Sequence, residues 1–134
     1  GFEVVYSIFP KWEFTAADAA AAYGVHGALI VGDRLSIASA RRDRMAELSN
    51  FIVKMDSDSG IGVSGHARNV LGGPLDALKF LVEEIASYPS CEPLSPGELV
   101  TTGTLTEAMP IRPGQTWSAR FEGIELRPLR LRLC

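Results

Sequence analysis

Glu3 is the first residue in this sequence whose type and position indicate chemistry. It stands inside an apolar, alternating run, residues 2–9 (FEVVYSIF). Burying a carboxylate in such a strand costs several kcal/mol unless the group is paired or bound to a metal. Hard cations such as Mg2+ and Mn2+ prefer oxygen ligands and would supply that partner. From spacing alone, a carboxylate at an exposed strand end explains the residue more simply.

A hydroxyl-rich turn, residues 101–106 (TTGTLT), is the second candidate site. Gly103 lets a ligand approach the backbone closely, and exposed N–H groups together with threonine hydroxyls form a good cradle for a carboxylate or a phosphate. A threonine-rich strand end is also common where no ligand binds. Both interpretations stay open on the pattern alone.

The histidines, the cysteines and the motifs absent from the sequence exclude several kinds of site. His26 and His66 are too few for a multi-histidine zinc site, and His26 is expected to be a hydrogen-bonded core residue. Cys91 and Cys134 belong to no CxxC motif and cannot form a disulfide framework. Gly72-Gly73 would receive an anion at a helix start, but close helix packing explains the pair better. The nucleophile-elbow, HExxH, P-loop and dinucleotide-binding motifs are absent.

The composition is that of one globular domain. The chain has 134 residues, of which 46% are hydrophobic and 22% charged, and this argues against disorder. A net charge of -3 gives no basic field for nucleic acid, and no apolar run reaches the roughly 18 residues that cross a bilayer. We therefore expect a cytoplasmic protein that binds neither nucleic acid nor a membrane. Because residue 1 already stands in a strand-like run, we also expect a single domain, residues 1–134, that is truncated at its N-terminal side.

The elements that position these candidates are mostly strands. Apolar and alternating patterns predict about seven of them, at residues 2–9, 26–31, 45–54, 61–64, 98–102, 115–121 and 124–133. The sequence DSDSG at residues 56–60 predicts a turn that joins the third and fourth into a hairpin. Pro128 and the arginines of the last run suit the edge of a sheet. The charged stretch 33–44 predicts a turn or hairpin with a solvated basic face.

Two helices complete the predicted elements. Thr15 and Asp18 form an approximate capping box for a short helix at residues 16–22. Pro74 begins a clearer helix with apolar residues at helical spacing. These residues are Leu75, Leu78, Leu81, Val82 and Ile85. The elements together predict an α+β fold, a strand-dominated mixed β-roll or sandwich with two helices.

Short segments in register along nearly the whole chain carry a family likeness. They are residues 2–7 (FEVVYS), 11–12 (KW), 27–32 (GALIVG), 70–75 (VLGGPL), 96–106 (PGELVTTGTLT), 110–111 (PI) and 113–115 (PGQ). In order and spacing they resemble the carboxy-terminal half of the 2-keto-4-pentenoate hydratase/4-oxalocrotonate decarboxylase family, within the fumarylacetoacetate hydrolase superfamily. The resemblance implies the strand-rich catalytic fold of that superfamily.

The resemblance also implies a site. Family members are longer and hold a divalent metal with three acidic residues, two of them in an upstream Glu-x-Glu element that these residues lack. Glu3 matches the third and would bind Mg2+ or Mn2+. The carboxylate of a 2-oxo acid would lie on Thr102, Gly103 and Thr104. The resemblance identifies no acid/base residue in this chain.

The implied activity is that of a metal-dependent hydro-lyase or decarboxylase in aromatic catabolism. The hydratase adds water to a 2-hydroxydienoate or 2-oxoenoate, and related members release CO2 from a 2-oxo acid. A divalent ion chelated by the 2-oxo and carboxylate oxygens stabilises the developing dienolate in either case. The resemblance further implies a homo-oligomer or pairing with a related subunit, and we expect little turnover from these 134 residues alone.

Two alternatives remain beside that activity. The missing upstream carboxylates would fit a non-catalytic, strand-rich module that self-associates or joins a larger complex. An acylpyruvate- or fumarylacetoacetate-type C–C hydrolase is the other, because Ala22-Tyr23 stands where relatives often carry Asp-Asn.

Overall fold

The computed structural model describes residues 1–36 and 42–134 and falls into two compact units. The N-terminal unit is Gly1–Asp33 and the C-terminal unit is Arg34–Cys134. In the part of the chain that is described, no helix combines the length and the apolar character needed to cross a bilayer. Each unit has its own sheet, so each is treated separately below.

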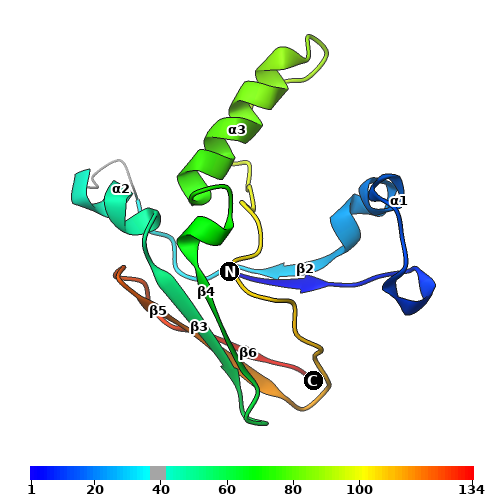
Figure 1. Cartoon of the computed structure of the whole chain (residues 1–134), viewed down its shortest axis with the longest axis vertical. Helices are drawn as coiled ribbons and strands as arrows, with labels where there is room; N and C mark the ends of the chain where they lie inside the picture. Colours follow the sequence, from blue (N-terminus) through cyan, green and yellow to red (C-terminus); the bar gives the residue numbers. More distant parts are fainter. Residues whose placement is uncertain (37–41) are drawn as a thin grey trace. The chain divides into compact units, whose positions relative to one another are not determined.

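The N-terminal unit is built on two antiparallel strands, β1 (Phe2–Val5) and β2 (His26–Ile30). Figure 1 shows them in blue shades. Three short helices lie between them in the sequence. These are η1 (Pro10–Trp12), α1 (Ala16–Ala21) and η2 (Tyr23–Val25). The ladder is interrupted by an irregularity between Val4 and Val5. The predicted strand at residues 26–31 is confirmed, whereas the predicted strand at 2–9 keeps only its first half.

The first strand ends early because the chain turns after it. The Ser7 hydroxyl accepts a hydrogen bond from the Phe9 N–H at 3.1 Å, which closes a local turn before η1. This side-chain bond to the backbone competes with ladder pairing. Apolar alternation alone does not reveal that competition.

Helix α1 begins as its capping box predicts. The Thr15 hydroxyl accepts from the Asp18 N–H at 3.2 Å, and the Asp18 carboxylate accepts from the Thr15 N–H at 2.9 Å. The two bonds satisfy N–H groups that have no partner inside the helix. The Thr15 backbone N–H, followed by its hydroxyl, holds the pKa of Asp18 below its ordinary value.

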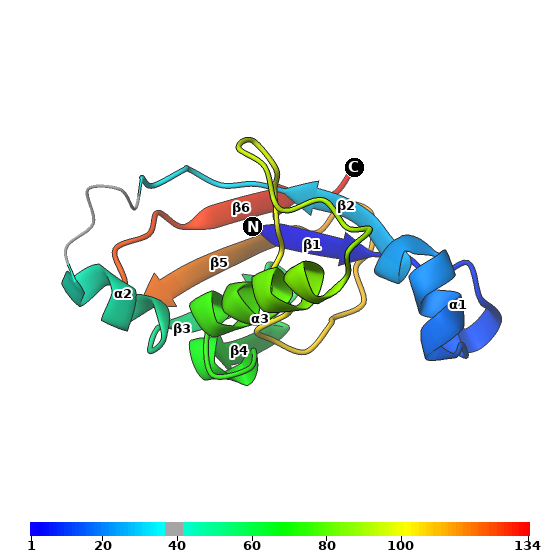
Figure 2. The ribbon, with the colours of Figure 1, turned by 90° about the horizontal axis from the view of Figure 1, so that it is seen from above.

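The C-terminal unit contains one four-stranded antiparallel sheet in the order β4-β3-β5-β6. Its strands are β3 (Ile52–Ser57), β4 (Gly62–His66), β5 (Thr116–Glu122) and β6 (Leu129–Arg132). Figure 2 shows them side by side in that order. The predicted β3–β4 hairpin is confirmed, and so is the edge position of the last strand. In β6 the leucines are half-buried and the arginines exposed, as the alternation predicts.

One face of this sheet forms the core. Trp117 and Ala119 of β5 lie on the same face of the sheet as Val53 of β3, and all three are buried. Trp117 keeps only 1% of its surface exposed. Ala67, just after β4, is fully buried as well. Because successive side chains of a strand point to opposite faces, this apolar set requires polar residues on the other side.

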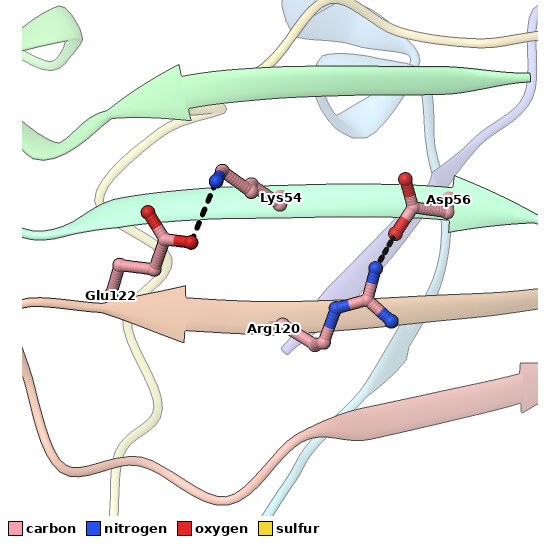
Figure 3. Close-up of polar contacts among 4 residues, drawn as sticks. All are labelled: Lys54, Asp56, Arg120 and Glu122. Atoms are coloured by element: carbon pink, nitrogen blue, oxygen red, sulfur yellow. Dashed lines mark hydrogen bonds and ion pairs between the residues drawn. The ribbon is translucent and has the colours of Figure 1, made fainter.

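The opposite face carries two ion pairs across β3 and β5, drawn in Figure 3. Lys54 Nζ lies 2.6 Å from Glu122 Oε1, and Arg120 is paired with Asp56. All four side chains are between 44% and 60% exposed. The alternation between a buried apolar face and a charged exposed face fixes the register, because a slip by one residue would bury these charges.

Three α-helices are present in the described residues, not the two predicted. The third is α2 (Arg42–Leu48), which occupies part of the stretch 45–54 that was predicted to be a strand. The prediction was wrong at residues 45–48 (MAEL), which are good helix formers and whose apolar spacing fits both periods, and right at residues 52–54, which begin β3. The turn or hairpin predicted at residues 33–44 lies partly outside the described residues, at 37–41.

Helix α3 (Pro74–Ser87) begins at the predicted proline and extends away from the end of β4 in Figure 1. None of its side chains is buried, and Phe80 and Val82 are 51% and 49% exposed. Of the predicted apolar stripe, Leu75, Leu78, Leu81 and Ile85 are half-buried, whereas Val82 is exposed. Gly73 before it packs closely on Ser49, because an added Cβ would come within 3.3 Å of the serine hydroxyl. An added Cβ at Gly72 would meet only Asp76 of α3 itself, so packing of the helix on the sheet through the paired glycines stays a prediction.

The predicted strand at residues 98–102 does not form. The stretch has no ladder partner and runs as an irregular segment after a turn at residues 96–97. Gly103, which follows it, has a φ of 116°, a left-handed conformation that ends any strand. The described residues thus form a strand-rich α+β fold with six strands, two in the N-terminal unit and four in the C-terminal unit.

Candidate functional site

Glu3 lies on β1 and forms a polar pair with His26, the first residue of β2. Glu3 Oε1 is 3.0 Å from His26 Nδ1, and the two side chains are 27% and 40% exposed. Glu3 stands opposite Leu29 in the ladder, and the irregularity after Val4 brings His26 within reach of the carboxylate. The backbone pairing of two strands therefore positions this pair.

The pair corrects one expectation and refines another. His26 is hydrogen-bonded, as expected, but its ring is partly exposed and does not belong to a core. It could not be recognised as the partner of Glu3 because 23 positions separate the two residues in the sequence. Glu3 is neither isolated nor fully buried, so its carboxylate does not require a metal for charge compensation.

The chemistry of Glu3 fits one ligand of a divalent cation. Carboxylates that bind metals are commonly held by a second hydrogen bond, and with the proton on Nδ1 the His26 ring donates one. Mg2+ takes about six oxygen ligands, several of them from water. Within residues 1–36 and 42–134, no group of three or more His, Cys, Asp and Glu side chains could hold a metal ion. The described residues therefore hold no complete cation site, and Glu3 as a metal ligand stays a prediction.

The second candidate, which we call the threonine loop (residues 101–106), lies in the C-terminal unit. Thr102 is half-buried, and Gly103 and Thr104 are exposed. Two features require a glycine at position 103: its positive φ of 116°, and the distance of 3.2 Å that an added Cβ would have from Val70 Cγ1. The loop therefore packs directly on the segment that follows β4.

A second close approach holds the same loop against β4. Gly65 lies so near the Leu105 carbonyl that an added Cβ would overlap the oxygen. The Asn69 side chain, one turn further along, donates a hydrogen bond from Nδ2 to that same oxygen at 2.9 Å. An isolated glycine inside a strand marks such an approach, and this is the sequence signal that could have revealed it. Nothing in the sequence points to Asn69.

The backbone of the threonine loop is suited to an anion. Among the described residues, no N–H group of residues 101–106 donates to another protein group. Exposed N–H groups around a glycine, together with hydroxyls, are the donors that bind carboxylates and phosphates. The carboxylate cradle at Thr102, Gly103 and Thr104 stays a prediction, and Glu3 belongs to the other unit.

The comparisons with known proteins concern the fold. No protein-family model matches the sequence. The chain is similar to 4-oxalocrotonate decarboxylase from Pseudomonas putida G7, in a structure complexed with magnesium and adipate. The TM-score is 0.81 and the identity 24%, over 98% of this chain and 47% of that chain. In a structure of that enzyme complexed with calcium and acetate, the values are 0.57 and 26%, over 66% of this chain and 32% of that chain.

These likenesses confirm the resemblance drawn from the sequence motifs. The chain has the fold of part of a fumarylacetoacetate hydrolase superfamily enzyme, and it spans about half the length of the decarboxylase that it matches. The match covers the strand-rich architecture and does not distinguish a roll from a sandwich.

Proposed function

We propose, from the fold shared with 4-oxalocrotonate decarboxylase, that this chain is part of a divalent-metal-dependent enzyme acting on small 2-oxo acids. The observation that carries the proposal is the match at a TM-score of 0.81 over 98% of the chain. One structure of the decarboxylase holds magnesium and adipate, and another holds calcium and acetate. The decarboxylase therefore binds a divalent cation and carboxylates. We extend the same two ligand classes to this chain, with Mg2+ or Mn2+ as the cation.

Glu3 and the threonine loop would bind different classes of ligand, each within its own unit. Glu3 would bind the cation through its carboxylate, while His26 holds one carboxylate oxygen in place. Thr102, Gly103 and Thr104 would receive the substrate's carboxylate on N–H and hydroxyl donors. The cation, when bound, supplies Lewis-acid stabilisation of negative charge on the 2-oxo group. The remaining metal ligands would come from outside the described residues.

Two reactions fit this arrangement, and we propose hydration first. A hydratase would add water to a 2-hydroxydienoate or 2-oxoenoate and give a 4-hydroxy-2-oxo acid, a step of aromatic catabolism in the cytoplasm. A decarboxylase, which the neighbour's name supports, would release CO2. A C–C hydrolase of the acylpyruvate type is a further possibility because Ala22-Tyr23 departs from the family pattern. The products distinguish the three reactions.

The test uses the complete gene product, with whatever residues it has beyond these 134. Calorimetric titration with MgCl2 is expected to give saturable binding, and NMR of a 2-hydroxypenta-2,4-dienoate mixture is expected to give the hydrated product. Release of CO2 from 4-oxalocrotonate would assign decarboxylation instead. Failure to bind Mg2+ or Mn2+, together with unchanged substrates, would overturn the proposal.

A non-catalytic role is the second candidate, because the described residues contain no complete cation site. A strand-rich module of this kind would act by associating with itself or with a related, complete subunit. Sedimentation velocity of the 134-residue chain tests this role. A monomer at all concentrations would count against it, and a stable dimer without metal binding would favour it.

A further inference from the structure

Few hydrogen bonds hold residues 99–111 in place. This stretch contains no helix or strand. Among the described residues, one hydrogen bond reaches it, from Asn69 Nδ2 to the Leu105 carbonyl at 2.9 Å. Van der Waals contacts hold it as well, between Gly65 and Leu105 and between Val70 and Gly103. The polar attachment of the threonine loop therefore depends on a single side chain.

The place of that bond determines what it can do. Leu105 follows directly after Thr104, so the bonded carbonyl adjoins the residues whose N–H and hydroxyl groups form the cradle. Asn69 belongs to η3 (Ala67–Asn69), and Ala67 at its start is fully buried in the core. The amide thus connects a fixed part of the C-terminal unit to a segment that has no ladder of its own.

We propose that Asn69 is a positioning residue, which holds the threonine loop in the conformation that binds a 2-oxo acid's carboxylate. This inference rests on the proposed function of the loop. Asn69 touches the loop from the side of Leu105 and does not itself contact the acid. A cradle built from backbone N–H groups binds an anion well only when its donors are already arranged, because ordering them on binding costs free energy.

The experiment compares two asparagines that make the same kind of bond. Asn69→Leu removes the amide donor to Leu105 without adding charge. Asn50→Leu is the control, since Asn50 Nδ2 also donates to a backbone carbonyl at 2.9 Å, that of Ala46, while its Oδ1 additionally accepts a hydrogen bond from Arg68 of η3. The probe is 2-oxoadipate, whose six carbons and two carboxylates match the adipate bound by the structural neighbour. Its Kd is measured from the amide chemical shifts of residues 101–106.

Asn69→Leu is expected to weaken 2-oxoadipate binding about three- to tenfold, the range of one lost hydrogen bond. Without ligand, the 15N order parameters of the loop amides are expected to fall in this variant alone. Asn50→Leu is expected to leave both quantities at their wild-type values. Asn50→Leu, which loses two hydrogen bonds, is expected to lower Tm at least as much as Asn69→Leu, which loses one, and this separates positioning from general loss of stability.

The outcomes separate this inference from the proposed function. If wild type binds 2-oxoadipate at the loop and Asn69→Leu binds it equally well, the positioning role is wrong and the proposed function stands. An equal loss of affinity in Asn50→Leu would also overturn it. If wild type shows no shifts at residues 101–106, the carboxylate site itself is wrong, and the positioning role is overturned with it.

Discussion

The two candidate regions are positioned in different ways. Glu3 and His26 lie on paired strands, so a backbone ladder sets their distance. The threonine loop has no ladder, and glycine approaches at Gly65 and Gly103 together with one amide bond set its position. In the ladder, several backbone hydrogen bonds together hold Glu3 and His26 in place. In the loop, only a few atomic contacts hold Thr102, Gly103 and Thr104. We therefore expect single substitutions to disturb the loop more than the strand pair.

The largest effect is expected from Gly65→Ala, which attacks the loop through its closest approach. The added Cβ would overlap the Leu105 carbonyl oxygen, so backbone must move, at a cost of about 1–3 kcal/mol in the free energy of unfolding. Urea denaturation measures this loss. Gly62→Ala in the same strand is the control, since its Cβ would meet the flexible Asp56 carboxylate at 3.1 Å. Equal stability of the two variants would mean that the close approach of Gly65 to Leu105 does not hold the threonine loop.

The next effect is expected on cation affinity, at the strand pair. Glu3→Gln removes a negatively charged oxygen ligand but keeps the size of the side chain, so Mg2+ binding by the complete gene product should weaken at least about tenfold. Stability should change little, because the ladder around Glu3 is intact. Glu13→Gln in the same unit is the control, and calorimetry is the measurement. Unchanged Mg2+ affinity would remove Glu3 from the metal site.

A smaller effect is expected at the charged face of the sheet, where backbone hydrogen bonds between β3 and β5 hold the strands together independently of the ion pairs. Asp56→Asn breaks the pair with Arg120 and is expected to cost about 0.2–1 kcal/mol, because both side chains are largely in water. The loss should shrink in 1 M NaCl, where exposed charges are screened. A cost above about 2 kcal/mol, unaffected by salt, would mean that this face is not open to solvent.

The smallest effect is expected at the start of α1. The pKa of Asp18 is lower in the folded chain than in an unfolded one, because its carboxylate accepts the Thr15 N–H. Its contribution to stability is therefore fully present above the unfolded pKa, near 4, and is lost as pH falls through the folded value. Asp18→Asn should remove this acid-side dependence. Identical pH profiles of α1 unfolding in the two proteins would contradict the capping role.

The sequence predicted elements whose signals are local. The capping box at Thr15, the hairpin turn at residues 56–60 and the proline start of α3 each depend on a few neighbouring residues. The strand at 98–102 was predicted wrongly because its alternation says nothing about a ladder partner. Residues 45–48 have apolar spacing that suits a helix as well as a strand, and helix propensity decided between the two.

The site was predictable only in its residue types. Glu3 and the threonine loop were identified from the chemistry of carboxylates and hydroxyls and from the family resemblance. His26 and Asn69 were not linked to them, because their contacts join positions 23 and 36 residues apart. Contacts of this kind depend on strand register and loop packing, which no local pattern encodes.

The order of strands has a consequence for the speed of folding. β3 joins β4 through a short turn, but its other neighbour, β5, returns only after the whole of α3 and the irregular stretch behind it. A hairpin closes on the order of microseconds, whereas pairing across a long connection must first overcome the entropy of closing that loop. Until β5 pairs with β3, Trp117 is not in place and the apolar face of β3 remains exposed to solvent. The central strand is thus half-paired early and fully covered late, and this interval is when the newly made chain is most open to aggregation.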